Sequence, residues 1–153
     1  MNSANLKDDL RLVNRMIGSS GRLTQELDRR MKSEFSLSLA KYDVLMVIDR
    51  SESGEITMSN LSRELLVSNA NMTGMTSRLQ SDGLVEKKSL PSDRRIFSVA
   101  LTEEGKRKLL EAGNKHCIWI RELMACIDCN EADYMNSLLD KLDRQLEEFS
   151  QDQ

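Results

Sequence analysis

The sequence predicts a mainly α-helical fold with one small β hairpin, and three observations support it. Apolar residues recur at helical spacing over most of the 153 residues. Near the middle of the chain, the period changes to the alternation of two short strands. The sole Pro lies between those strands. The length suits one compact domain with its own hydrophobic core.

The composition of the chain indicates the cellular compartment in which the protein is expected. No apolar run approaches the roughly 18 to 20 residues needed to cross a membrane. The N-terminus lacks the layout of a signal peptide. Three Cys without an export signal favour free thiols in a reducing compartment. We therefore expect a soluble, cytoplasmic protein without a membrane partner.

The charge distribution is more informative than the net charge of −3. Residues 57–108 hold nine Lys/Arg against six Asp/Glu, whereas residues 109–153 hold four against ten. A basic middle third suits contact with a phosphate backbone, and an acidic last third would face away from it.

A long amphipathic helix is predicted over roughly residues 5 to 33. One face of this helix is predicted to be mainly apolar, because its residues recur at three-, four- and seven-residue steps: Leu6, Leu10, Val13, Ile17, Thr24, Leu27 and Met31. Such a helix has more apolar surface than a small domain can cover. Part of it is therefore predicted to be a dimer surface.

A second helix is predicted from Leu39 to about Arg50, with Ser38 as its N-cap. Tyr42 on this helix either lines a ligand pocket or packs in the core. After a turn at residues 51–54, Glu55 and Ile56 form a minimal strand.

Residues 57–78 read as two short helices joined by a tight turn. Thr57 and Ser68 cap them, and Gly83 follows where a left-handed C-cap belongs. The second helix leaves a polar face of small side chains, which suits hydrogen bonding to base edges in a DNA major groove. The alternative is an ordinary surface helix. The candidate DNA contacts on it are Ser68, Asn69, Asn71, Thr73, Thr76 and Arg78.

Residues 84–88 and 96–101 read as the two strands, with Phe97, Val99 and Leu101 on one face. The intervening tip carries Arg94 and Arg95. A charged hairpin directly after a helix-turn-helix predicts a winged helix, in which an Arg at the tip can enter a narrow minor groove. Arg94 and Arg95 complete the predicted DNA-binding residues; a solvated turn is the alternative.

The segment from Asp93 to Gly105 resembles the wing signature of the MarR family of bacterial transcription regulators. It reads Asp-Arg-Arg, five residues, then Leu-Thr-Glu-Glu-Gly. The resemblance extends over almost the whole chain. It implies a homodimer that binds a pseudo-palindromic DNA operator, usually as a repressor. It also implies that Arg95 is the wing arginine and that residues 68–78 are the reading helix, although Gly74 departs from longer polar residues of some members.

The last third is predicted to be helical. Thr102 caps one long helix, and Asn130 with Asp133 signals the cap of another. We therefore expect one domain over residues 1–153, with a winged helix-turn-helix at 38–103. The helices at 1–34 and 104–153 would intertwine in the dimer.

The segment from His116 to Leu123 is similar to the corresponding segment in a subgroup of the family that responds to aromatic acids or their coenzyme A thioesters. An aromatic wall with one titratable donor can hold a ring and a polar substituent. Packing of His116 and Trp119 in the dimer core is the alternative. The candidate effector-binding residues are Arg15, Ser19, Tyr42, Met46, His116 and Trp119.

Two other functions stay open. Cys126 and Cys129 form a Cys-x-x-Cys, and Cys117 lies upstream, so a thiol-based redox-sensing repressor is conceivable. A winged helix that binds protein instead of DNA is the other. No nucleophile–base pair, phosphate loop or metal set is evident, so an enzyme, a cofactor and a metal site are not expected.

Overall fold

The computed structural model describes the backbone of residues 3–90 and 93–151 and the side chains of residues 6–88 and 97–149. Within these ranges, no helix is long and apolar enough to span a bilayer. The chain divides into two compact units, Met1–Cys117 and Ile118–Gln153, which we describe separately. The predicted hairpin tip at Pro91 lies outside the described residues.

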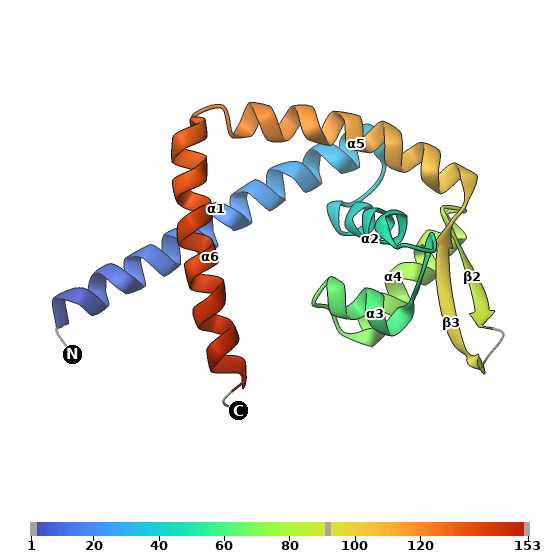
Figure 1. Ribbon diagram of the computed structural model, residues 1–153. Helices are drawn as coiled ribbons and strands as arrows, with labels where there is room; N and C mark the ends of the chain where they lie inside the picture. The colour runs from blue at the N-terminus through green and yellow to red at the C-terminus, as the bar shows by residue number, and fades with distance from the viewer. Residues whose placement is uncertain (1–2, 91–92, 152–153) are drawn as a thin grey trace. The chain divides into compact units, whose positions relative to one another are not determined.

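Helices dominate the chain, and a three-stranded antiparallel sheet accompanies them (Figure 1). The fold class predicted from the sequence is therefore confirmed. The elements are α1 (Ser3–Phe35), α2 (Leu39–Arg50), β1 (Glu55–Thr57), α3 (Met58–Glu64), α4 (Asn69–Ser81), β2 (Val85–Leu90), β3 (Asp93–Leu101), α5 (Glu103–Leu123) and α6 (Cys129–Gln151).

The core of the first unit forms around α2, which contacts α1, α3, β1 and β3. Val44, Leu45 and Ile48 of α2 are completely buried. The inward-facing positions of the helix pair behave as their spacing predicts, since Leu61 of α3 and Leu79 of α4 are also fully buried. Burial of each such side chain stabilises the fold by about 1.5–3 kcal/mol.

The caps predicted for α2, α3 and α4 are confirmed. The hydroxyls of Ser38, Thr57 and Ser68 accept hydrogen bonds from backbone N–H groups three residues later, at 3.2, 3.4 and 3.3 Å. Gly83 has φ +72°, the left-handed conformation expected after α4. These caps fix both ends of α4, and with them the direction of its exposed face.

The start of α5 is held directly against the end of α4. The Thr102 hydroxyl donates to the Gly83 carbonyl oxygen at 2.7 Å, and the Thr102 N–H donates to the Leu84 carbonyl oxygen at 3.1 Å. A Cβ at Gly105 would overlap that same Leu84 oxygen. The Thr and Gly of the Leu-Thr-Glu-Glu-Gly motif are therefore required by this close approach.

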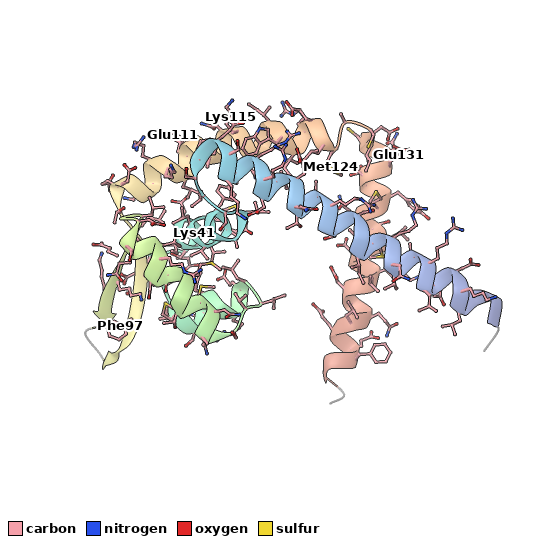
Figure 2. All side chains as sticks on the ribbon, turned by 180° about the vertical axis from the view of Figure 1, so that it is seen from behind. Lys41, Phe97, Glu111, Lys115, Met124 and Glu131 are labelled. Atoms are coloured by element: carbon pink, nitrogen blue, oxygen red, sulfur yellow. The ribbon has the colours of Figure 1, made fainter. Side chains whose placement is uncertain are left out.

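The sheet has the order β1-β3-β2, so β3 is central. Val85 pairs with Leu101 and Lys88 with Ser98. Val99 and Leu101 are buried as predicted, whereas Phe97 is 47% exposed because it lies further toward the tip (Figure 2). Both strands also extend further into the tip than predicted, because their backbones continue to pair beyond Lys88.

The second unit contains the end of α5 and the whole of α6. The predicted cap at Asn130 is wrong, because Asp128 caps α6. The Asp128 carboxylate accepts from the Glu131 N–H at 2.9 Å, and the Glu131 carboxylate accepts from the Asp128 N–H at 3.0 Å. This reciprocal capping box satisfies two backbone donors and starts the helix two residues earlier than a cap at Asn130.

Candidate nucleic-acid interface and ligand cavity

One face of α4 is exposed and polar. Its surface carries Asn69, Asn71, Thr73, Ser77 and Arg78. Toward the helix-turn-helix turn, this face borders an open hollow of about 460 Å³. Gly74 leaves the middle of the face low, since an added Cβ would meet nothing within 4 Å. Such a helix can approach a groove closely and still present amide and guanidinium groups.

Two hydroxyls on this face already bond to the helix backbone. Ser68 accepts from the Asn71 N–H as the N-cap, and Thr73 donates to the Asn69 carbonyl oxygen at 2.8 Å. Asn69, Asn71 and Arg78 are the longer polar side chains of this face, and all three are exposed. Asn bonds adenine and Arg bonds guanine through paired hydrogen bonds, so these side chains are the ones suited to base reading.

Thr76 does not belong to the exposed face, and its prediction as a DNA contact is wrong. The residue is completely buried. Its hydroxyl donates to the Met72 carbonyl oxygen at 3.0 Å and lies 3.8 Å from the Met58 sulfur. A hydroxyl that bonds to the backbone of its own helix can be buried at little cost, so its polarity does not indicate that it is exposed.

The hairpin adds basic side chains beside α4. Lys87 of β2 donates to the Ser77 hydroxyl at 3.1 Å, which joins the hairpin to the polar face. Lys88 pairs with Glu86 at 2.9 Å, and the pKa of Lys88 is raised by this hydrogen bond. Lys87 was not among the predicted contacts, and the structure pairs it with Val99 of β3. Arg94 and Arg95 lie in β3, but their side chains are outside the described residues.

Residues 37–97 match the model of the MarR family. The chain carries a MarR-family domain. The HTH-type transcriptional regulator PecS of Dickeya dadantii is 24% identical over 135 residues, which cover 86% of this chain and 81% of PecS. The HTH-type transcriptional repressor IacR of Pseudomonas putida is 32% identical over 85 residues, which cover 56% of this chain and 49% of IacR.

Among solved structures, a mutant MarR from E. coli in complex with operator DNA superposes with a TM-score of 0.72 and 26% identity. The match covers 88% of this chain and 96% of that one. The chain is accordingly a DNA-binding transcriptional regulator of the winged helix-turn-helix class and not an enzyme.

A cavity of about 380 Å³ lies between α2 and α5. Tyr42 and Met46, both predicted effector residues, line it. The other lining residues are Asp49, Lys106, Leu109, Leu110, Gly113 and Asn114. Gly113 lies next to the Tyr42 hydroxyl, and a Cβ added there would make an ordinary van der Waals contact with it at 3.5 Å. Sequence reasoning missed the α5 residues because their spacing is that of an ordinary amphipathic helix.

The predicted effector residue His116 lies against Tyr42. Their ring centroids are 5.0 Å apart, and the rings are inclined at 49°. Burial lowers the pKa of His116, and the carboxylate of Asp43 opposes that shift. Burial likewise raises the pKa of Asp43, although the charges of His116 and Arg50 oppose it. The aromatic edge of the cavity is thus joined to two half-buried titratable groups.

The remaining predicted effector residues do not line this cavity. Arg15 borders a hollow along α1, and Ser19 on the same helix accepts a hydrogen bond from Arg22 at 3.3 Å. Trp119 follows His116 by one helical turn, belongs to the second unit and is buried. The structure therefore brings Tyr42, Met46 and His116 together and leaves Arg15 and Ser19 apart from them.

The three cysteines are exposed and unbridged. Cys117 lies on α5, Cys126 in the turn after it, and Cys129 is the first residue of α6. Within the described residues, no group of three or more His, Cys, Asp or Glu side chains is arranged to hold a metal ion.

Proposed function

We propose that the chain is a homodimeric repressor that binds a pseudo-palindromic operator and is released from it by a small aromatic acid or its acyl thioester. The exposed Asn69, Asn71 and Arg78 of α4 are the observation that carries this proposal. Their amide and guanidinium groups suit base edges, and Lys87 supplies a cation beside them for the phosphate backbone. Relatives such as IacR, which is named a repressor, support the sign of regulation.

A second copy of the chain is proposed to cover the exposed apolar faces of α1 and α6. On α1 the exposed side chains are Leu6, Leu10, Leu12, Val13 and Ile17. On α6 they are Tyr134, Met135, Leu138, Leu139, Leu142, Leu146 and Phe149. Monomeric proteins rarely leave so many contiguous apolar groups in water. In this proposal residues 38–103 bind DNA, and residues 1–34 and 104–153 form the dimer.

The cavity between α2 and α5 is the proposed effector site. Tyr42, Leu109 and Leu110 offer an apolar and aromatic wall, and Lys106 offers a cation for a carboxylate at its mouth. Lys106 already pairs with Glu103 at 2.8 Å on the same helix, so a ligand carboxylate would compete with Glu103 for it. A ligand wedged between α2 and α5 would alter the support of the helix-turn-helix.

Selection from a pool of random duplexes tests the DNA-binding part. The proposal expects enrichment of two inverted half-sites whose centres are about one helical turn, roughly 34–36 Å, apart. A pool with no enriched sequence would reject operator recognition. Enrichment of a single half-site would reject the dimer.

Release from the selected operator tests the effector. Aromatic acids and their coenzyme A thioesters are compared with peroxide, and the wild-type protein is compared with Cys126→Ser. The proposal expects release by an aromatic compound in both proteins. Release by peroxide alone, abolished by Cys126→Ser, would instead establish the thiol-based sensor.

A further inference from the structure

One ion pair joins the recognition helix to α2. The Lys41 ammonium, on the first turn of α2, lies 2.6 Å from the carboxylate of Asp82, which is the C-cap of α4 (Lys41 is labelled in Figure 2). The Lys41 side chain is only 22% exposed and that of Asp82 is 48% exposed. The pair is thus partly removed from water, which weakens its screening by salt.

Each charge of this pair stands at the unfavourable end of its own helix. Lys41 is the third residue of α2, where the partial positive charge of the helix N-terminus repels a cation. Asp82 ends α4, where the partial negative charge of the C-terminus repels an anion. Each charge is unfavourable with respect to the dipole of its own helix. The ion pair between Lys41 and Asp82 compensates for both unfavourable interactions.

The pair joins the two parts of the domain that the proposed function requires to communicate. Lys41 directly precedes Tyr42, which lines the ligand cavity. Asp82 directly precedes Gly83, whose carbonyl oxygen is held by Thr102 at the start of α5. The exposed face of α4 is therefore oriented from its C-terminal end by α2 through an ion pair and by α5 through hydrogen bonds.

We propose that Lys41 and Asp82 are positioning residues that set the orientation of the recognition helix for operator reading. The inference rests on the proposed operator binding. Base reading needs paired hydrogen bonds of defined direction, whereas non-specific binding needs only positive charge near phosphates. Loss of the pair should therefore lower affinity for the operator relative to affinity for a scrambled duplex.

The two single substitutions separate orientation from charge. Lys41→Met removes a positive charge and should weaken binding to a scrambled duplex, whereas Asp82→Asn removes a negative charge and should strengthen it. Both should nevertheless lower the ratio of operator to scrambled affinity, by about fivefold, the size expected for a partly exposed ion pair. Matched controls are Lys115→Met and Glu34→Gln, which make the same charge changes at the α1–α5 pair, where the Lys115 and Glu34 side chains lie 3.7 Å apart. The controls should leave the ratio unchanged.

The charge swap is the decisive variant. Lys41→Asp combined with Asp82→Lys restores an ion pair and places each charge at the favourable end of its helix. We expect the affinity ratio to return to within about twofold of wild type, with a thermal midpoint above that of either single variant.

Two results would overturn the inference. One is a wild-type affinity ratio in both single variants. The other is a charge swap that folds but keeps the lowered ratio, which would show that the residues act separately. A wild-type protein that does not prefer the operator would reject the proposed function itself.

Discussion

The recognition helix α4 and the terminal helix α6 are both surface helices, yet they expose opposite chemistry. The exposed face of α4 carries Asn, Thr, Ser and Arg, and its apolar residues Met72 and Leu79 are completely buried. α6 exposes Leu138, Leu142 and Phe149 to solvent. The difference shows that the apolar side of α4 is already buried within one chain, so its exposed surface suits a polar partner. The apolar side of α6 is still exposed, so it suits an apolar partner. Under the proposed function, the partner of α4 is DNA and the partner of α6 is a second copy of the chain.

The largest expected effect is on α6. Leu138→Asp with Leu142→Asp places two charges on its apolar face, and each Leu is expected to contribute about 1.5–3 kcal/mol when buried. The dimer dissociation constant should rise by more than about a thousandfold. Sedimentation equilibrium measures it, with Asn136→Asp on the same helix as the control. An unchanged dimer would assign the apolar face of α6 to another partner.

The next effect is on the polar face of α4. Asn71→Ala removes a candidate base contact, and discrimination against one base pair should fall by about 1–3 kcal/mol. Binding to a scrambled duplex should stay close to wild type. Affinities for a set of singly substituted operators measure this, and Asn60→Ala on α3 is the control. An equal loss on every duplex would make Asn71 a backbone contact.

A smaller effect is expected at the hairpin. Arg95→Ala should weaken binding to all duplexes and reduce the magnitude of the log–log salt slope by about 0.9, the value for one neutralised phosphate. Anisotropy titrations at several salt concentrations measure the slope. If affinity and slope are both unchanged, Arg95 has no role at the wing.

The smallest effect concerns His116, at the aromatic edge of the cavity between α2 and α5. Folding lowers the pKa of His116 below its ordinary value of 6.5 because the ring is buried. The unfolded chain therefore binds more protons than the folded chain between the lowered pKa and about 6.5, and wild-type stability should fall as the pH decreases through that interval. His116 is the only His, so His116→Gln should lack this part of the decline. Thermal midpoints against pH, compared between the two proteins, test it; parallel curves would show that His116 titrates equally in both states.

Features determined by a few neighbouring residues could be predicted from the sequence. The caps at Ser38, Thr57 and Ser68 and the positive φ of Gly83 depend on side chains or turns within three residues. The prediction of the α6 cap was wrong because two cap signals overlap in the sequence, one at Asn130 and one at Asp128. The reciprocal hydrogen bonds between Asp128 and Glu131 place the cap at Asp128.

Features that depend on distant residues could not be predicted. The burial of Thr76 depends on α3 packing over it, and the cavity between α2 and α5 depends on α5 passing α2. The ion pair between Lys41 and Asp82 spans 41 residues and has no local pattern. Sequence periodicity predicts which face of a helix is apolar, but not which polar side chains meet across the fold.

In the proposed function, the polar face of α4 recognises the operator sequence, and the basic residues around it supply general affinity for DNA. The most direct measurement is the affinity of the wild-type protein for its selected operator and for a scrambled duplex over a range of salt concentrations. We expect both affinities to fall steeply with salt along parallel log–log lines, with the operator line higher by at least about a thousandfold. Coincident lines, or a salt-independent interaction, would contradict the account.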